Sequence, residues 1–211
     1  MILLIFFPDL SIRLYADDTK LYFNICCSDD RVLLQSDINS VIEWSSTWQL
    51  SLAVNKCSVL HVGTHATNHY YRLGVSSLPI CNTISDLGVE VDNLLSFETH
   101  IHNMVSIANR RIYLIRRYFH SEDIIYLIKS FVVFVRPLLE YCSPVSCPSY
   151  KHLVDSVESV QRRFTKYLPC FSSVSYSERL KCLELDTLEL YRLYIDLTLY
   201  FKTCNGCVAL N

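Results

Sequence analysis

The segment Ser11-Ile12-Arg13-Leu14-Tyr15-Ala16-Asp17-Asp18-Thr19-Lys20-Leu21-Tyr22 decides how the first half of the chain folds. Two β-type runs, Ser11 to Tyr15 and Lys20 to Ile25, flank residues 16–19 and therefore predict a β-hairpin. The adjacent carboxylates Asp17 and Asp18 then lie at the hairpin tip, at a sheet edge. Asp tolerates turn geometry well, so an Asp-Asp pair acquires functional meaning only from the sequence around it.

Short β-type runs continue to about residue 95. They are Ile12–Tyr15, Leu21–Ile25, Leu50–Val54, Val59–Val62 and Leu87–Val91, and the apolar start, residues 1–7, is interpreted as a further buried strand. One helix interrupts them, from about Arg31 to Trp48, with Asp29 and Asp30 in its first turn. Its apolar stripe is Leu34, Ile38, Val41, Ser45 and Trp48.

After residue 95 the hydrophobic period is helical. Ser96 is the expected N-cap of a helix whose stripe is Ile101, Met104, Val105, Ala108, Ile112 and Ile115. Ser121, with Glu122 and Asp123, opens a second helix that is apolar nearly all round and is expected at the centre of a bundle, ending near Pro137. A third helix buries Leu153, Val157, Val160, Phe164 and Leu168. A fourth runs from Thr187 to Asn205-Gly206 and buries Leu190, Leu193, Tyr194, Leu197 and Phe201.

Composition narrows the class of protein. Of 211 residues, 51% are hydrophobic and 19% are charged, which excludes disorder over most of the chain. Apolar runs are too short to span a bilayer, so no membrane partner is expected. Ten cysteines without an export signal indicate free thiols in an intracellular protein of the nucleus or cytoplasm, not a secreted one.

The hairpin and its flanks resemble the active-site hairpin of reverse transcriptases, more narrowly those of jockey-like non-LTR retrotransposons. The resemblance rests first on Tyr15-Ala16-Asp17-Asp18-Thr19-Lys20-Leu21-Tyr22. Further segments in that family's order and approximate spacing are Leu34–Asn39, Trp48–Leu52, Asn55–Cys57, Asp86–Val89, Arg136–Val145 and Val160–Lys166. The resemblance covers nearly the whole chain. It departs at Ser146, where the family usually has a tryptophan and looser packing is expected.

The resemblance implies an α+β fold: a partial antiparallel palm sheet with one covering helix (1–95), then an α-helical thumb-like bundle (96–211). It also implies RNA-directed DNA polymerisation, in which carboxylates hold two Mg²⁺ ions about 4 Å apart. By the resemblance, Asp17 would be the direct metal ligand, Asp18 its neighbour, and Tyr15 would pack beneath the primer terminus. Lys56 would donate a proton near the pyrophosphate; a solvated turn lysine is the alternative.

The family's palm also needs an aspartate on a separate strand before the hairpin, a segment that shapes the nucleotide pocket, and a fingers region. Only 16 residues precede Asp17, and Asp9 is the one acid among them. Two adjacent carboxylates at one turn cannot clamp two ions and position a nucleotide. The 211-residue chain is therefore predicted not to polymerise by itself.

Basic side chains after residue 95 are the candidates for nucleic-acid contacts. Residues 96–170 hold ten Lys/Arg against six Asp/Glu, whereas residues 1–95 hold five against ten. The candidates are Arg110, Arg111, Arg116, Arg117, Lys151, Arg162, Arg163 and Lys166. They would contact phosphates of an RNA template and a DNA primer without reading sequence. An ordinary exposed basic helix face is the alternative.

Other patterns are weaker. Cys204-Asn205-Gly206-Cys207 has no second ligand pair at zinc-site spacing and is explained by a helix cap. His65 and His69 fall in a polar loop, where their spacing does not impose one face. Three functions stay open: part of a reverse transcriptase, a non-catalytic nucleic-acid-binding remnant of such an element, or an interaction module that self-associates through the uncovered palm edge.

Overall fold

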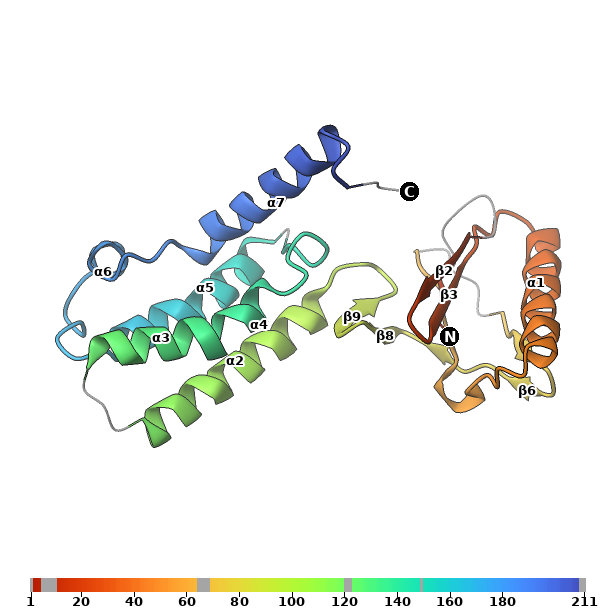
Figure 1. Ribbon diagram of the computed structural model, residues 1–211, viewed down its shortest axis with the longest axis horizontal. Coiled ribbons are helices and arrows are strands. Elements are labelled where there is room, and N and C mark those ends of the chain that lie inside the picture. The colour runs from red at the N-terminus through yellow and green to blue at the C-terminus, as the bar shows by residue number, and fades with distance from the viewer. Residues whose placement is uncertain (1, 5–10, 64–68, 120–122, 149, 209–211) are drawn as a thin grey trace. The chain divides into compact units, whose positions relative to one another are not determined.

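The computed structural model describes residues 2–4, 11–63, 69–119, 123–148 and 150–208. The chain forms two compact units, Met1–Ser96 and Phe97–Asn211. Within the described residues every strand lies in the first unit, and every α-helix except α1 lies in the second (Figure 1). The mixed α and β class is confirmed. The boundary in the sequence between the two units, after Ser96, lies next to residue 95, where the hydrophobic period changes from that of strands to that of helices.

The hairpin predicted around the paired aspartates is confirmed. Strands β2 (Ser11–Tyr15) and β3 (Asp18–Tyr22) pair antiparallel, with Tyr15 opposite Asp18. The connecting loop is therefore only Ala16 and Asp17, and Asp18 is already a strand residue. Ala16 has φ 52°, in the left-handed region that two-residue hairpin loops use to match the twist of their strands.

The sheet that contains this hairpin is mixed, so the expected antiparallel sheet is wrong for three of its strands. Its order is β2-β3-β1-β4-β7, with β1 (Ile2–Leu4) parallel to both β3 and β4 (Ser58–Leu60), and β4 parallel to β7 (Ile80–Cys81). The reason is topological. Helix α1 (Ser28–Thr47) lies in the connection between β3 and β4, and such a crossover returns the chain in the same direction.

Helix α1 covers one face of the sheet. Leu21 and Phe23 from the β3 segment form one core cluster with Leu34 and Ile38 from α1. Trp48, expected in this stripe, is 66% exposed because it is the C-cap, where the helical period ends. Asp30 at the other end accepts the backbone N–H groups of Cys26 and Cys27 at 2.7 and 2.8 Å, which lowers the pKa of its carboxyl.

The strand expected over 50–54 is absent from the structure. Residues 50–53 have no regular structure, and Val54–Lys56 form a short 3-10 helix. Its turn is closed by the Cys57 backbone N–H, which donates to the Val54 carbonyl at 3.0 Å. Alternation of Leu50, Leu52 and Val54 thus reflects a partly buried loop, since no neighbouring strand in the described residues pairs with it.

Two small antiparallel hairpins complete the first unit. They are β5 (Arg72–Leu73) with β6 (Ser76–Ser77), and β8 (Thr83–Asp86) with β9 (Val89–Asp92). Leu87 and Gly88 form the tip of the second, with φ 47° and 84°. Two successive left-handed residues are the geometry of a type I′ turn, which accounts for the glycine.

The second unit is a helical bundle. Its helices are α2 (Glu98–Tyr118), α3 (Ile124–Phe134), α4 (Arg136–Glu140), α5 (Lys151–Lys166), α6 (Tyr176–Cys182) and α7 (Leu188–Cys204). The predicted stripes of α2 and α5 are confirmed as core, where Phe131 and Phe164 stack with ring centroids 4.4 Å apart. Helix α3 ends at Phe134, three residues before Pro137, close to the predicted end.

Helices α2 and α5 lie side by side and run parallel. Three contacts join them in order: Glu98 Oε1 to His152 Nε2 at 3.8 Å, Asn109 Oδ1 to Arg163 Nη1 at 3.2 Å, and the Arg116 guanidinium to the Tyr167 ring at 3.8 Å. From one contact to the next, both partners advance along the chain by similar numbers of residues, so the two helices run in the same direction. The carboxyl-terminal ends of the two helices therefore lie together.

Helix ends differ from expectation at two places. The N-cap of α2 is Phe97 rather than Ser96, because the Ser96 hydroxyl donates to Asp92 Oδ2 at 2.7 Å. Helix α6 is an element that the pattern analysis missed. Its start carries a capping box in which the Ser175 side chain accepts from the Glu178 N–H, a spacing visible in the sequence. The predicted openers Ser121 and Glu122, and also Asp9, lie outside the described residues; Asp123 caps α3.

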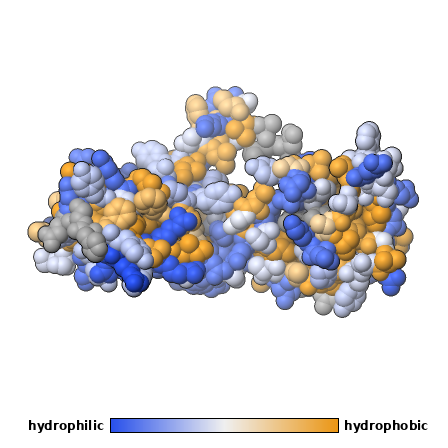
Figure 2. Space-filling view, turned by 60° about the horizontal axis from the view of Figure 1, so that its bottom comes forward, coloured by the Kyte–Doolittle hydropathy of each residue, from blue (hydrophilic) through white to orange (hydrophobic). Residues whose placement is uncertain are grey.

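Two helices keep apolar side chains on the surface, contrary to expectation. Helix α3 is not central, because Ile125, Tyr126 and Val133 are 60–61% exposed. The predicted core stripe of α7 is exposed too: Leu190, Leu193, Tyr194, Leu197 and Phe201 range from 42% to 66%. Figure 2 accordingly shows hydrophobic patches on the surface. Amphipathic spacing identifies a shared face but does not say whether another element covers it.

Candidate active-site hairpin and basic surface

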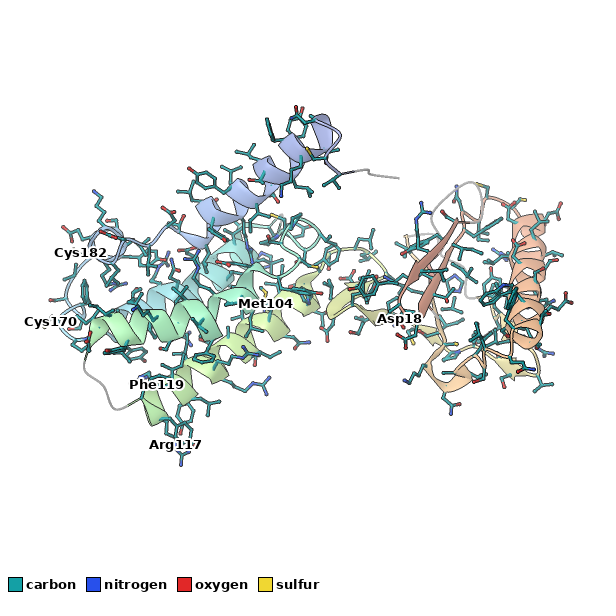
Figure 3. The ribbon with its side chains drawn as sticks, viewed as in Figure 1. Asp18, Met104, Arg117, Phe119, Cys170 and Cys182 are labelled. Carbon is teal, nitrogen blue, oxygen red and sulfur yellow. The ribbon has the colours of Figure 1, made fainter. Side chains whose placement is uncertain are left out.

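The carboxylate pair lies at the turn of the β2–β3 hairpin, with Asp17 in the loop and Asp18 at the start of β3. Asp17 and Asp18 are both exposed, and Figure 3 shows Asp18 at the end of the hairpin. Residues 18, 20 and 22 of β3 share one face because side chains alternate along a strand. Leu21 and Phe23 point to the opposite face, into the core with α1. The carboxylate of Asp18 thus belongs to the sheet face away from the covering helix.

The same face holds a buried ion pair that sequence reasoning missed. The ammonium of Lys20 contacts Asp86 Oδ1, with side chains only 10% and 18% exposed. Arg13 lies opposite Lys20 and Ser11 opposite Tyr22 in the hairpin register. Burial raises the pKa of the Tyr22 hydroxyl, with Lys20 opposing that shift and Asp86 adding to it. The polar face of β3 is therefore an electrostatically coupled surface.

Tyr15 and Lys56, the other predicted palm residues, are both exposed. Tyr15 is 63% exposed and pairs with Asp18 across the hairpin. The side chains of directly opposite residues in an antiparallel pair point to the same face, so Tyr15 lies on the face of the Asp18 carboxylate. Lys56 ends the short 3-10 helix before β4. In the described residues, no hydrogen bond or ion pair joins the Lys56 side chain to Asp17 or Asp18.

The described residues do not complete a metal centre. They contain no group of three or more His, Cys, Asp or Glu side chains able to hold an ion. A two-metal site requires ligands from more than one position around both ions, and Asp17 and Asp18 supply one position. Cys204 and Cys207 are exposed free thiols, and Gly206 at φ 67° follows the C-cap Asn205, which confirms the capping explanation. The described part of the chain therefore does not fit a complete Mg²⁺ pair.

The basic residues divide into different surfaces. Arg116 and Arg163 lie on the α2–α5 seam through Tyr167 and Asn109. Arg110 and Arg117 are seven residues apart on an exposed face of α2, and Figure 3 shows Arg117 near the carboxyl-terminal end of the helix. Lys166 is exposed three residues after Arg163. We group these five exposed side chains of α2 and α5 under the name basic seam: Arg110, Arg116, Arg117, Arg163 and Lys166.

Three predicted residues lie elsewhere. The Arg111 guanidinium donates from Nη1 to the Phe134 carbonyl at 2.8 Å, at the end of α3. Arg162 lies over the Tyr176 ring of the α6 segment, 5.1 Å from its centroid. Lys151 is exposed at the opposite, amino-terminal end of α5. Arg111 and Arg162 contact neighbouring elements of the bundle, and Lys151 lies at the other end of α5. These three residues are therefore not part of the basic seam.

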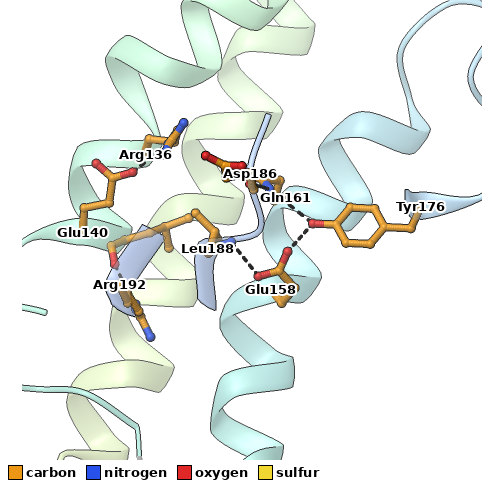
Figure 4. A network of polar contacts seen from close by, with 9 residues as sticks. Arg136, Glu140, Glu158, Gln161, Tyr176, Asp186, Leu188 and Arg192 are labelled. Atoms are coloured by element: carbon orange, nitrogen blue, oxygen red, sulfur yellow. Dashed lines mark hydrogen bonds and ion pairs between the residues drawn. The ribbon is translucent and has the colours of Figure 1, made fainter. Parts of the chain in front are cut away.

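A buried polar network holds α5, α6 and α7 together (Figure 4). Glu158 on α5 accepts the Tyr176 hydroxyl and the Leu188 backbone N–H, the latter at 2.9 Å. Gln161, fully buried, donates to the Asp186 carbonyl at 2.8 Å. Arg192 on α7 donates to the Leu139 carbonyl at 2.9 Å. The network orients α5, which carries two of the five basic-seam residues, Arg163 and Lys166.

The chain is similar to one uncharacterized protein of Caenorhabditis elegans, with 28% identity over 130 residues. The match covers 60% of this chain and 66% of that protein's length. No family model matches the chain, and no solved structure matches it. No helix in the described residues has the length and apolar character needed to cross a membrane.

Proposed function

We propose that the chain is the part of an RNA-directed DNA polymerase that begins at the active-site hairpin. The observation that carries the proposal is the two-residue hairpin loop, which leaves Asp17 and Asp18 exposed on the sheet face opposite α1. Near the loop this face is exposed at Tyr15 and Asp18, whereas further along β3 it holds the buried Lys20–Asp86 ion pair. The hairpin would contribute one ligand position to a site completed by residues outside this chain.

The basic seam supports a second part of the same proposal. The basic seam consists of five cationic side chains that are exposed on α2 and α5, and Tyr113 and Tyr167 on the same two segments are 59% and 53% exposed. Cations bind phosphates without sequence preference and release counterions, and exposed aromatic rings stack on bases. The seam would hold template and primer backbones near a thumb-like bundle.

A binding experiment tests the seam. Anisotropy of a labelled RNA–DNA duplex is measured with the full chain over a series of salt concentrations. The variant Arg116→Gln/Arg163→Gln/Lys166→Gln is expected to bind weakly and to reduce the slope of log K against log salt by roughly three, about 0.9 for each lost phosphate contact. Arg111→Gln is the matched control, because Arg111 is committed to Phe134, and it should leave the slope unchanged. Equal effects of both variants would refute the seam.

A metal experiment tests the hairpin. Mn²⁺ broadens NMR signals of nearby nuclei and replaces Mg²⁺ on oxygen ligands. Selective broadening is expected at Asp17 and Asp18, and Asp17→Asn should remove it. The adjacent pair Asp29 and Asp30 is the internal control, since Asp30 is already occupied by backbone N–H groups. Equal broadening at both pairs would mean that negative charge alone attracts Mn²⁺ and that the hairpin has no specific metal site.

We expect no catalysis by the chain alone, because the carboxylates in the described residues do not make up a complete set of metal ligands. Template-dependent primer extension that Asp17→Asn abolishes would overturn this expectation. The second candidate, a non-catalytic nucleic-acid-binding remnant, is favoured by the exposed seam together with the incomplete metal set. It predicts seam-dependent binding without hairpin-specific Mn²⁺ broadening, so the two experiments separate the candidates. Self-association through the β2 edge, where Leu14 is 70% exposed, stays a third proposal.

A further inference from the structure

Helix α7 carries an uncovered apolar stripe along its whole length. Six large side chains on one face are exposed: Leu190 42%, Leu193 52%, Tyr194 60%, Leu197 56%, Tyr200 69% and Phe201 66%. On the opposite side of the helix, the buried residues are Leu188 and Arg192 near its start, and Ile195 and Leu199 further along are partly buried. Figure 1 shows the later turns of α7 diverging from the other helices of its unit. The core of this unit therefore does not use the stripe.

The stripe has the period of a coiled coil. Leu190, Leu197 and Cys204 recur every seven residues, and Leu193 and Tyr200 follow three residues after the first two. These are the a and d positions of a heptad, whose 3.5-residue repeat lets two helices supercoil around one seam. Tyr194 and Phe201 widen the stripe on one flank. A second amphipathic helix with the same repeat is the shape that fits it.

The exposed area is what a dimer needs. Taking roughly 200 Å² for a large side chain, the exposed fractions amount to roughly 700 Å² of apolar surface per chain. Stable protein interfaces bury about 800 Å² per partner, and monomers rarely leave apolar patches of this size uncovered. The patch is therefore large enough for a specific interface formed by two copies of one helix.

The charges beside the stripe select the parallel orientation. Glu189 and Asp196 lie on one flank and Tyr194 and Phe201 on the other. In an antiparallel pair each flank faces its own copy, so Asp196, near the middle of the helix, would face the same carboxylate. In a parallel pair the acidic flank faces the aromatic flank. We propose that two copies of this chain associate through a parallel α7–α7 coiled coil. The proposal is independent of the proposed function.

Sedimentation equilibrium of the full chain tests the dimer. A concentration-dependent dimer is expected, and Leu197→Glu, which places a charge in the seam, should raise its dissociation constant at least about 10-fold. Val133→Glu on α3 is the matched control, because Val133 is similarly exposed at 61% but lies outside the stripe. This variant should leave the dimer intact. A monomer at all concentrations, or equal loss in both variants, would overturn the proposal; the stripe would then bind another partner.

Cross-linking tests the orientation. A parallel pair brings Cys204 close to its copy, so a short bismaleimide should join two chains there. The cross-linked dimer should disappear in Cys204→Ser/Cys207→Ser and persist in Cys26→Ser/Cys27→Ser, which removes another exposed pair. A dimer that Leu197→Glu dissociates but that never cross-links through Cys204 or Cys207 would exclude the parallel arrangement.

Discussion

Lys20 on β3 is ion-paired with Asp86 on β8, and this contact ties the carboxylate hairpin to the second hairpin of the same unit. Both side chains are largely buried. The Lys20 backbone belongs to the strand that opens with Asp18. The position of the carboxylate face therefore depends on a charge contributed 66 residues further along the chain.

Asp86→Ala is expected to lower the free energy of unfolding of the first unit by about 3 kcal/mol, since it leaves the buried Lys20 charge unpaired. Urea denaturation followed by circular dichroism measures it. Lys20→Met/Asp86→Leu should restore most of the loss, because two apolar side chains replace the pair without an orphaned charge. Equal losses in the single and double variants would mean that packing rather than charge holds the contact.

Ala16→Gly in the hairpin loop is expected to be neutral or slightly stabilising. The left-handed φ of Ala16 costs an L-residue about 1 kcal/mol, which offsets the entropy that glycine loses on folding. Ala53, with φ −79°, provides the control, and Ala53→Gly should lose about 0.5–1 kcal/mol. Thermal unfolding of both variants compares them. A larger loss at position 16 than at position 53 would contradict the strained loop.

Tyr176→Phe is expected to destabilise the second unit by about 2 kcal/mol. The hydroxyl donates to the buried Glu158 carboxylate and accepts from Gln161 at 3.2 Å, and a hydrogen bond to a charged group contributes about 1.5–3 kcal/mol. Tyr194→Phe, at a tyrosine 60% exposed, is the matched control and should be silent in urea denaturation at low protein concentration. If both were silent, the network would not stabilise the bundle.

His61 makes the stability of the first unit pH-dependent. Burial lowers the pKa of its ring in the folded state, and the ring contacts the His69 carbonyl at 3.2 Å. The unfolded chain then binds a proton more readily, so stability is complete above the ordinary pKa of 6.5 and decreases as pH falls below it. Urea midpoints measured from pH 8 to pH 5 should show this decrease, and His61→Asn should flatten it. An unchanged slope in the variant would assign the effect to other groups.

Local patterns predicted the elements whose faces are filled by neighbours in the same unit. Alternation around Asp17 specified the hairpin, and the spacing of Ile101, Ala108 and Ile112 specified the buried face of α2, because one-sided burial imposes a period. Parallel pairing of β1 was not predictable from its short apolar run. The Lys20–Asp86 contact joins distant segments that share no local pattern.

The candidate site was predictable to a similar degree. The resemblance located the aspartates at a hairpin, and the structure places them at its turn. Sequence could not separate Arg116 from Arg111, since both are basic residues of one helix. Their partners, Tyr167 and Phe134, belong to different neighbouring elements, so only tertiary packing distinguishes a seam residue from one that connects helices.

The parallel alignment of α2 and α5 has an electrostatic consequence. Each helix macrodipole carries about half a negative charge at its carboxyl end, and here the two negative ends lie together. Arg116 and Arg117 occupy the last turn of α2, and Arg163 and Lys166 that of α5. About one of these four positive charges is thus offset by the peptide dipoles themselves. The potential that a polyanion meets is lower than the side-chain count suggests, and the bundle can hold four cations close together with less mutual repulsion.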